Sequence, residues 1–186
     1  MAVTFTTSGT AAAGGVQQSY ALVHAALLEG QLSDIRDNTI GTYINETAVV
    51  QPFGDLQVYN LAGTVANSAT TISGATDTVL GVNVLTYVDE TALNADGRPG
   101  VKVDQVLNVA NEGAVAVYVT GAVTPASPVR VLYSASGTGK AGQFSHAFAS
   151  GKTVRLSNAR FLSSTTGSGL AILELNGPSF TLSADS

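Results

Sequence analysis

The chain has 186 residues, of which only eight are Lys or Arg, and its formal net charge is −5. The basic residues form no cluster, so nucleic acid is not expected as a partner, because binding to a phosphate backbone depends on grouped cations. The absence of cysteine excludes disulfides and thiolate metal sites, and there is neither an apolar run of membrane-spanning length nor a signal-peptide pattern. These features predict a protein that is made in a cytoplasm and binds no membrane.

The surface of the folded chain is expected to be covered by other subunits. Charged residues make up only 11% of the sequence and hydrophobic residues 45%. A small soluble monomer usually carries more charge, and large exposed apolar patches are unusual on monomers. The composition therefore predicts an oligomer or a lattice, with a closed homotrimer favoured over a dimer.

The N-terminal region predicts an arm followed by a helix. Residues 1–15 contain few large apolar groups and end in a glycine pair, which is typical of an extended arm that is ordered only when it docks. Residues 16–29 carry the one helical pattern, which ends before Gly30. Its apolar positions are Val16, Tyr20, Val23 and Leu27.

Beyond about residue 50, apolar and polar residues alternate with a period of two, which is typical of half-buried strands. The alternating sets are Leu56 and Val58; Leu80, Val82 and Val84; Val101, Val103, Leu107 and Val109, with a bulge at Gln105 and Val106; Val115, Val117 and Val119; Val129, Val131 and Tyr133; Val154 and Leu156; and Ala171, Leu173 and Leu175. Turn signals separate them at residues 94–97, 111–113, 136–139 and 167–169.

This pattern predicts an all-β fold, an antiparallel barrel or sandwich with at most one or two short helices. The expected division places the arm and a short helix or strand region in residues 1–49, and a β-rich domain in residues 50–186.

No constellation of catalytic residues is visible in the sequence. His24 and His146 each lack an acidic or histidine neighbour at metal-ligand spacing, and Ser145 beside His146 lacks a base and a third orienting group. We therefore expect no enzyme, no cofactor and no metal, and we assign no catalytic, cofactor-binding or metal-ligating residue.

Two segments imitate known binding loops only in part. Residues 137–140 read Gly-Thr-Gly-Lys, but Ser134 and Ala141 occupy positions where a phosphate-binding loop needs Gly and Ser or Thr. Residues 94–97 read Asn-Ala-Asp-Gly, but Ala92 and Val103 occupy positions where a calcium loop needs acids. Both segments are therefore predicted to be turns.

Four stretches, taken in order, resemble the family of phage structural cement proteins. They are Gly30-Gln-Leu-Ser-Asp34 with Ile40-Gly-Thr-Tyr43 and Gln51-Pro-Phe-Gly54; Val79-Leu-Gly-Val82; Glu112-Gly-Ala-Val-Ala-Val-Tyr-Val119 with Gly121-Ala-Val123 and Ala126-Ser-Pro-Val-Arg-Val131; and Ala159-Arg-Phe161 with Gly169-Leu-Ala-Ile-Leu-Glu-Leu-Asn-Gly177. The resemblance spans roughly residues 28–177. The sequence departs from the family at Ser127, where an acidic residue is usual, and residues 16–29 do not match.

The resemblance implies a β-tulip or barrel-like domain on the outer capsid surface of a virion. Such a protein would bind the major capsid protein and cement neighbouring capsid subunits. The candidate shell or subunit contacts are the apolar residues of the arm and the helix: Val3, Phe5, Tyr20, Val23 and Leu27.

Two other classes compete with this interpretation. A tail, baseplate or fibre component would also be acidic and β-rich, but long fibres usually show repeats and none is visible. A carbohydrate-binding β-sandwich would favour exposed aromatic side chains, whereas this chain has no Trp and only 6% aromatic residues.

Overall fold

The computed structural model describes residues 27–34, 37–86 and 91–184, and these residues contain fourteen strands and no helix. The strands are β1 (Thr39–Ile44), β2 (Gln51–Pro52), β3 (Leu56–Tyr59), β4 (Ala69–Thr71), β5 (Val79–Asn83), β6 (Thr91–Leu93), β7 (Pro99–Val101), β8 (Val106–Val119), β9 (Arg130–Leu132), β10 (Phe144–Ser145), β11 (Thr153–Leu156), β12 (Ala159–Phe161), β13 (Gly169–Asn176) and β14 (Leu182–Ala184). The predicted all-β class is confirmed. The predicted arm, and all but the end of the predicted helix, lie outside the described residues.

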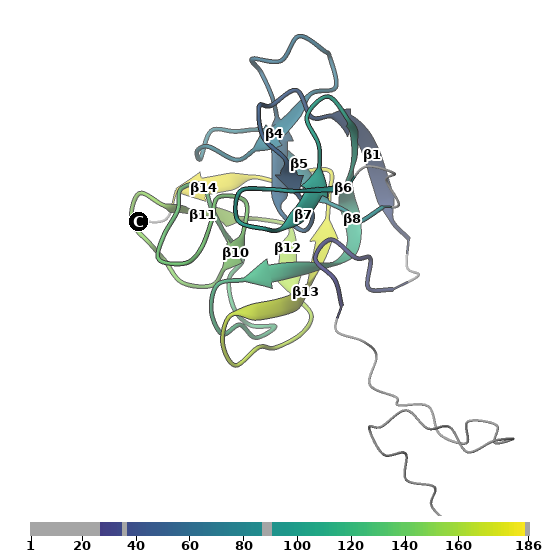
Figure 1. The fold of residues 1–186 in the computed structure, drawn as a ribbon. Coiled ribbons are helices and arrows are strands. Elements are labelled where there is room, and N and C mark those ends of the chain that lie inside the picture. Colours follow the sequence, from purple (N-terminus) through teal and green to yellow (C-terminus); the bar gives the residue numbers. More distant parts are fainter. Residues whose placement is uncertain (1–26, 35–36, 87–90, 185–186) are drawn as a thin grey trace, which may run out of the picture.

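Strand β8 organises the molecule because its two halves have different partners (Figure 1). Its first half pairs with β1 and with β5, and its second half pairs with β13. The pairing of β1 places residues 39–44 in the same sheet as the rest of the chain. The division at residue 49 stays a prediction.

The larger sheet has eleven strands but does not close into a barrel. Its main path runs β14-β11-β9-β10-β8-β5-β3-β4, with β1, β12 and β13 attached beside it. The two end strands, β14 and β4, do not pair in the described part of the chain, which corrects the expectation of a barrel. The physical reason is that β8 branches: a strand whose halves pair with different neighbours divides the sheet instead of continuing it around a cylinder.

The predicted antiparallel pairing is nearly complete among the described strands. The one parallel pair of named strands joins β10 to β8 through Phe144 and Val119. A separate three-stranded sheet, in the order β2-β7-β6, is antiparallel throughout.

Two local predictions were wrong. Residues 101–109 do not form one strand: β7 ends at Val101, the chain turns with Asp104 at φ 59°, and Val103 is 39% exposed. Conversely, the signal at 111–113 is not a turn, because β8 runs through it. The register of β1 against β8 shifts there, so the polar residues occupy an irregularity within a continuous strand.

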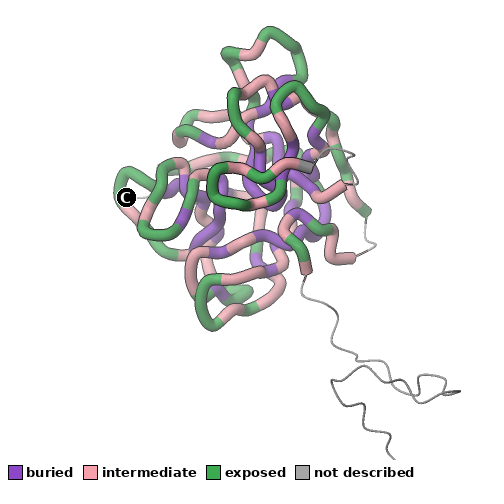
Figure 2. The backbone as a smooth tube through the Cα atoms, in the orientation of Figure 1, coloured by how far each residue is buried: buried purple, intermediate pink, exposed green. Residues whose placement is uncertain are grey.

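The core lies between the crossing strands, where Figure 2 shows the buried backbone gathered at the centre. Its larger cluster contains the predicted inward positions in the second half of β8 and on β11 and β13, together with three aliphatic residues of β3 and β5. The predicted positions in the first half of β8, Leu107 and Val109, belong to the smaller cluster. Ala114 and Ala116 are also buried, so the second half of β8 is covered on both faces. A strand in that position must carry apolar residues on both faces, which is why alanine alternates with valine there.

Substitution of Gly81 by alanine is expected to destabilise the contact between β5 and β8. Gly81 has φ 144°, and a Cβ atom built on it would lie 2.0 Å from the carbonyl oxygen of Ala110. The strands would have to separate, so we expect the free energy of unfolding to fall by about 1–3 kcal/mol. Denaturant unfolding measures this, with Gly167→Ala as the control because its Cβ would meet nothing within 4 Å. Equal stability of the two variants would contradict the prediction.

Candidate functional site

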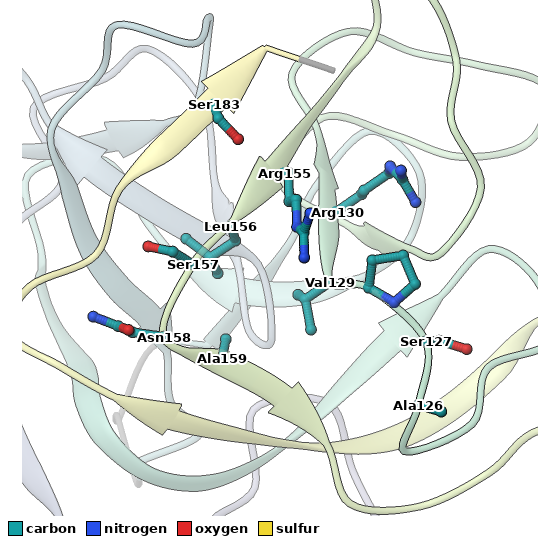
Figure 3. A pocket seen from close by; sticks show the side chains of 11 residues that line it. Ala126, Ser127, Val129, Arg130, Arg155, Leu156, Ser157, Asn158, Ala159 and Ser183 are labelled. Carbon is teal, nitrogen blue, oxygen red and sulfur yellow. The ribbon is translucent and has the colours of Figure 1, made fainter. Parts of the chain in front are cut away.

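A hollow of about 750 Å³ opens between β9, β11, β12 and β14, and two arginines line it (Figure 3). Arg130 lies on β9 and Arg155 on β11, and the two residues are direct partners in the antiparallel register. Each follows a buried valine and precedes a buried aliphatic residue, so the alternation of the strands turns both side chains away from the core. We call this feature the arginine hollow.

The arginine hollow is positively charged. Arg155 is exposed, and Arg130 donates a hydrogen bond to the backbone carbonyl of His146. None of the described residues that line the hollow is acidic, and its remaining walls are formed by small, polar or aliphatic residues.

A second hollow, of about 430 Å³, has the opposite charge. Asp37, Glu112 and Glu174 line it, together with residues 113, 114, 175 and 176. Glu174 forms an ion pair with Arg160, whereas Asp37 and Glu112 are exposed. We call this feature the acidic hollow.

A third charged group is buried beneath the start of the described chain. Arg98 binds Asp55 through two hydrogen bonds of 2.6 and 2.9 Å and binds Glu29 at 2.7 Å. The Asp55 side chain is 2% exposed and that of Arg98 14%. Through Arg98, Glu29 near the start of the described chain is connected to Asp55 in the turn before β3.

Burial dominates the electrostatics of this group. It raises the pKa of Asp55 to about 7, although the hydrogen bonds and the charge of Arg98 act in the opposite direction. Burial alone would lower the pKa of Arg98, but Asp55 and Glu29 raise it above its ordinary value. Arg98 is therefore charged and is the counter-ion on which the buried carboxyl depends.

The backbone at residues 30–33 is attached to β8. The N–H groups of Gly30 and Ser33 donate to the carbonyls of Ala116 and Ala114, both at 2.8 Å. Gly30 has φ 78°, and a Cβ atom there would lie 2.8 Å from the backbone nitrogen of Leu85. Only glycine fits this close approach. These contacts hold residue 30 at a fixed point beside β8.

An apolar loop lies at another edge, between β3 and β4. Leu61 in this loop is 91% exposed and Val65 is 42% exposed. Glu46 holds the loop, since its carboxylate accepts hydrogen bonds from the hydroxyl and N–H of Thr64 and from the N–H of Val65. The hydrogen bond from the Thr64 hydroxyl is the main reason that the pKa of Glu46 falls to about 2. Holding a loop in one conformation reduces the entropy that it loses on binding.

Most of the predicted contact residues lie outside the described residues: Val3, Phe5, Tyr20 and Val23. Leu27 is the first residue described after them, and it is partly exposed in a segment without helical hydrogen bonds. The structure therefore does not test these residues as contacts.

The segments that imitate active sites have local structural roles. The Oγ atom of Ser145 accepts a hydrogen bond from the N–H of Ala147 at 3.0 Å. Residues 94–97 and 136–139 form turns, as predicted. Among the described residues, no group of three His, Cys, Asp or Glu side chains is placed to hold a metal ion.

The described chain contains no helix that is long and apolar enough to cross a membrane.

The charged features were missed by sequence reasoning, although each leaves a signal. Arg130 and Arg155 occupy polar positions between apolar strand residues, which indicates an outward direction but not a partner. Asp55 stands between a glycine and a buried leucine in a chain with few charges. An acid in such a position favours a buried ion pair, but the sequence does not name its partner.

The described part of the chain is thus an all-β domain whose surface carries charged hollows. The family of structural cement proteins that includes E217 gp24 and Pam3 gp6 matches residues 16–176. This match covers most of the chain, so the chain belongs to the phage structural cement protein family. Its role is that of a structural component of the virion, located on the capsid.

A chain of a solved structure titled "The capsid of Myoviridae Phage XM1" has a similar fold. The TM-score is 0.61 at 18% sequence identity, and the alignment covers 90% of this chain and 98% of that chain. At this identity the likeness shows a shared fold. No curated protein matches the sequence.

Proposed function

We propose that this protein binds the outer surface of a phage capsid and cements neighbouring subunits of the major capsid protein. The observation that carries the proposal is the family match over residues 16–176. It favours a capsid role over a tail, baseplate or fibre component and over a carbohydrate-binding module.

In this mechanism the shell is stabilised by many contacts between the protein and a repeating lattice of capsid subunits. Each subunit bridges neighbouring shell proteins, so several weak contacts act together and the second contact forms at high effective concentration. A ligand that binds only the assembled shell stabilises that state by mass action. Such a protein needs a rigid domain and exposed contact surfaces, in keeping with the Glu46-held loop that presents Leu61.

The finer features of the proposal are a β-tulip-like domain, a homotrimer on the shell and an N-terminal arm that reaches a neighbouring subunit. The trimer suits local threefold positions between capsomers, and closed symmetry avoids open polymerisation. In the arm and the segment after it, Val3, Phe5, Tyr20, Val23 and Leu27 supply apolar contacts. The ion pair of Glu29 with Arg98 supports the arm proposal, because a fixed point of departure limits the region that the preceding residues reach.

Deletion of residues 2–13 tests this proposal. The full chain is expected to decorate heads that lack it, and this binding tests the cement function itself. The truncated chain should keep its domain fold but leave the heads at lower temperature or lower denaturant concentration, because it loses apolar contacts that form only on binding. Centrifugation of heated heads followed by gel densitometry measures retention. Equal retention of both chains would contradict the arm proposal, while failure of the full chain to bind would contradict the function.

A further inference from the structure

We propose that an apolar hollow beside Arg98 binds residues 16–26 of the same chain in the free subunit. The apolar hollow has a volume of about 430 Å³ and is lined by residues of β2, β4 and β6, by the turn after β6 and by residues 140 and 141. The inference goes beyond the proposed function, because it concerns the protein before it reaches a capsid.

The rim of the apolar hollow exposes large aliphatic side chains to water. Val49 is 60% exposed and Leu93 is 66% exposed. The other apolar residues that line it are Val50, Pro52, Ala95 and Ala141. Exposed apolar surface of this kind marks binding sites, because covering it removes apolar area from water. The apolar hollow therefore suits an apolar occupant.

The charged residues of the apolar hollow are paired within the domain. Lys140 binds Asp96 at 2.7 Å, and Arg98 binds both the buried Asp55 and Glu29. A charged partner would compete with these pairs, and separating Arg98 from a buried carboxyl is costly. An uncharged partner leaves the pairs intact, so the chemistry of the apolar hollow favours a segment without charged side chains.

The N-terminal residues, which lie outside the described part of the chain, have the matching composition. Residues 1–26 contain no Asp, Glu, Lys or Arg. Within them, Tyr20 and Val23 supply large side chains at a spacing of one helical turn. The family match begins at residue 16, so residues 16–26 belong to the matched part of the chain. Residues 16–26 are therefore the occupant to which the inference commits.

The start of the described chain lies beside the apolar hollow. Glu29 binds Arg98, and Arg98 lines the hollow. Val23 precedes Glu29 by six residues, which span about 9 Å in a helix and at most about 22 Å when extended. Either length reaches a site next to Arg98. So short a tether gives the chain's own segment a high effective concentration at the hollow, which favours it over the segment of a second copy.

The test uses a tryptophan reporter, because the natural chain contains no Trp. Tyr20→Trp is introduced into the full chain, alone and together with Leu93→Asp or Val49→Asp, which add a charge to the rim of the apolar hollow. In the reporter alone, emission should lie at a shorter wavelength, and acrylamide should quench it at least about twofold less than in either combined variant, because a bound indole is removed from water. Circular dichroism establishes that every variant is folded.

Leu61→Asp is the matched control, because it makes the same substitution at a leucine that is 91% exposed and does not line the apolar hollow. With this control the reporter should keep its emission and quenching. Dilution over about a hundredfold should also leave the emission unchanged, because binding within one chain does not depend on concentration.

Three outcomes overturn the inference. The first is a reporter that responds to neither Leu93→Asp nor Val49→Asp. The second is a reporter that responds equally to Leu61→Asp. The third is an emission that changes on dilution, which shows that a second copy supplies the segment.

The capsid takes no part in this measurement, so the inference and the proposed function fail separately. A chain whose reporter is bound but which does not decorate heads contradicts only the proposed function. A chain that decorates heads but whose reporter is exposed to water in the free subunit contradicts only this inference.

Discussion

Replacement of Arg98 by alanine is expected to lower the free energy of unfolding by about 3–5 kcal/mol near pH 8. Arg98 is the counter-ion of the buried Asp55, with hydrogen bonds of 2.6 and 2.9 Å to the two carboxylate oxygens. Without it, the folded state must either hold an uncompensated buried charge or bind a proton at Asp55, and near pH 8 both are more costly than the loss of an exposed ion pair. Urea unfolding followed by circular dichroism measures the difference.

The pH dependence of this variant identifies the cause. Arg98 lowers the pKa of Asp55, so its removal raises the pKa in the folded state further above the value in the unfolded chain. A carboxyl with a raised folded-state pKa contributes stability at low pH and loses that contribution as the pH rises through this pKa. The free energy of unfolding that Arg98→Ala loses relative to the wild type should therefore be smaller at pH 5 than at pH 8.

The control for this prediction is Lys140→Ala. Lys140 forms an ion pair with Asp96 at 2.7 Å, but the two side chains are 47% and 38% exposed. Exposed pairs contribute about 0–1 kcal/mol, so this variant should remain close to the wild type. If Arg98→Ala loses as little free energy of unfolding as the control, the charge of Asp55 is not what Arg98 balances. A loss of free energy that does not change with pH would show the same.

Replacement of Phe144 by alanine is expected to cost about 3–5 kcal/mol and to lower Tm by on the order of 10 °C. Phe144 is fully buried in the larger cluster and stands where β10 joins β8 to β9. Its backbone carbonyl accepts a hydrogen bond of 3.0 Å from the N–H of Thr120. The substitution leaves a cavity beneath β10. Because this strand has only two residues, it has few other contacts to keep it in place. Calorimetry or denaturant unfolding measures both quantities.

Phe148→Ala makes the same substitution four residues later and is the matched control. Phe148 is 49% exposed, so its removal leaves no internal cavity, and a change within about 0.5 kcal/mol is expected. If the two variants lose the same stability, the packing of Phe144 is not what stabilises the junction of β8, β9 and β10.

The alternation of small apolar and polar residues was enough to predict the strand class and many inward positions. Val154 and Leu156 on β11, and Leu173 and Leu175 on β13, are buried as their spacing indicated. The glycine-containing turn at residues 94–97 was also readable. These features depend on local backbone preferences and on which face of a strand avoids water, and both are properties of neighbouring residues.

Pairing between distant strands was not readable in the same way. Alternation indicates which face of a strand is buried but not which strand lies beside it. That β14 and β4 are unpaired end strands of an open sheet therefore followed only from the three-dimensional arrangement. The polar residues at 111–113 resembled a turn, yet β1 and β13 both pair with β8 at Glu112, and β5 pairs with it just before. These pairings keep the strand continuous. Tertiary hydrogen bonds there outweighed local preference.

The sequence by itself determined that this is a β-rich chain of low charge that resembles phage cement proteins, because composition and short-range spacing carry that information. The tertiary structure alone decided where the charges meet. Arg98 lies 43 residues from Asp55 and 69 from Glu29, and Arg130 faces Arg155 only because β9 pairs with β11. Electrostatic contacts depend on distance in space, and chain folding sets that distance through the packing of the whole core.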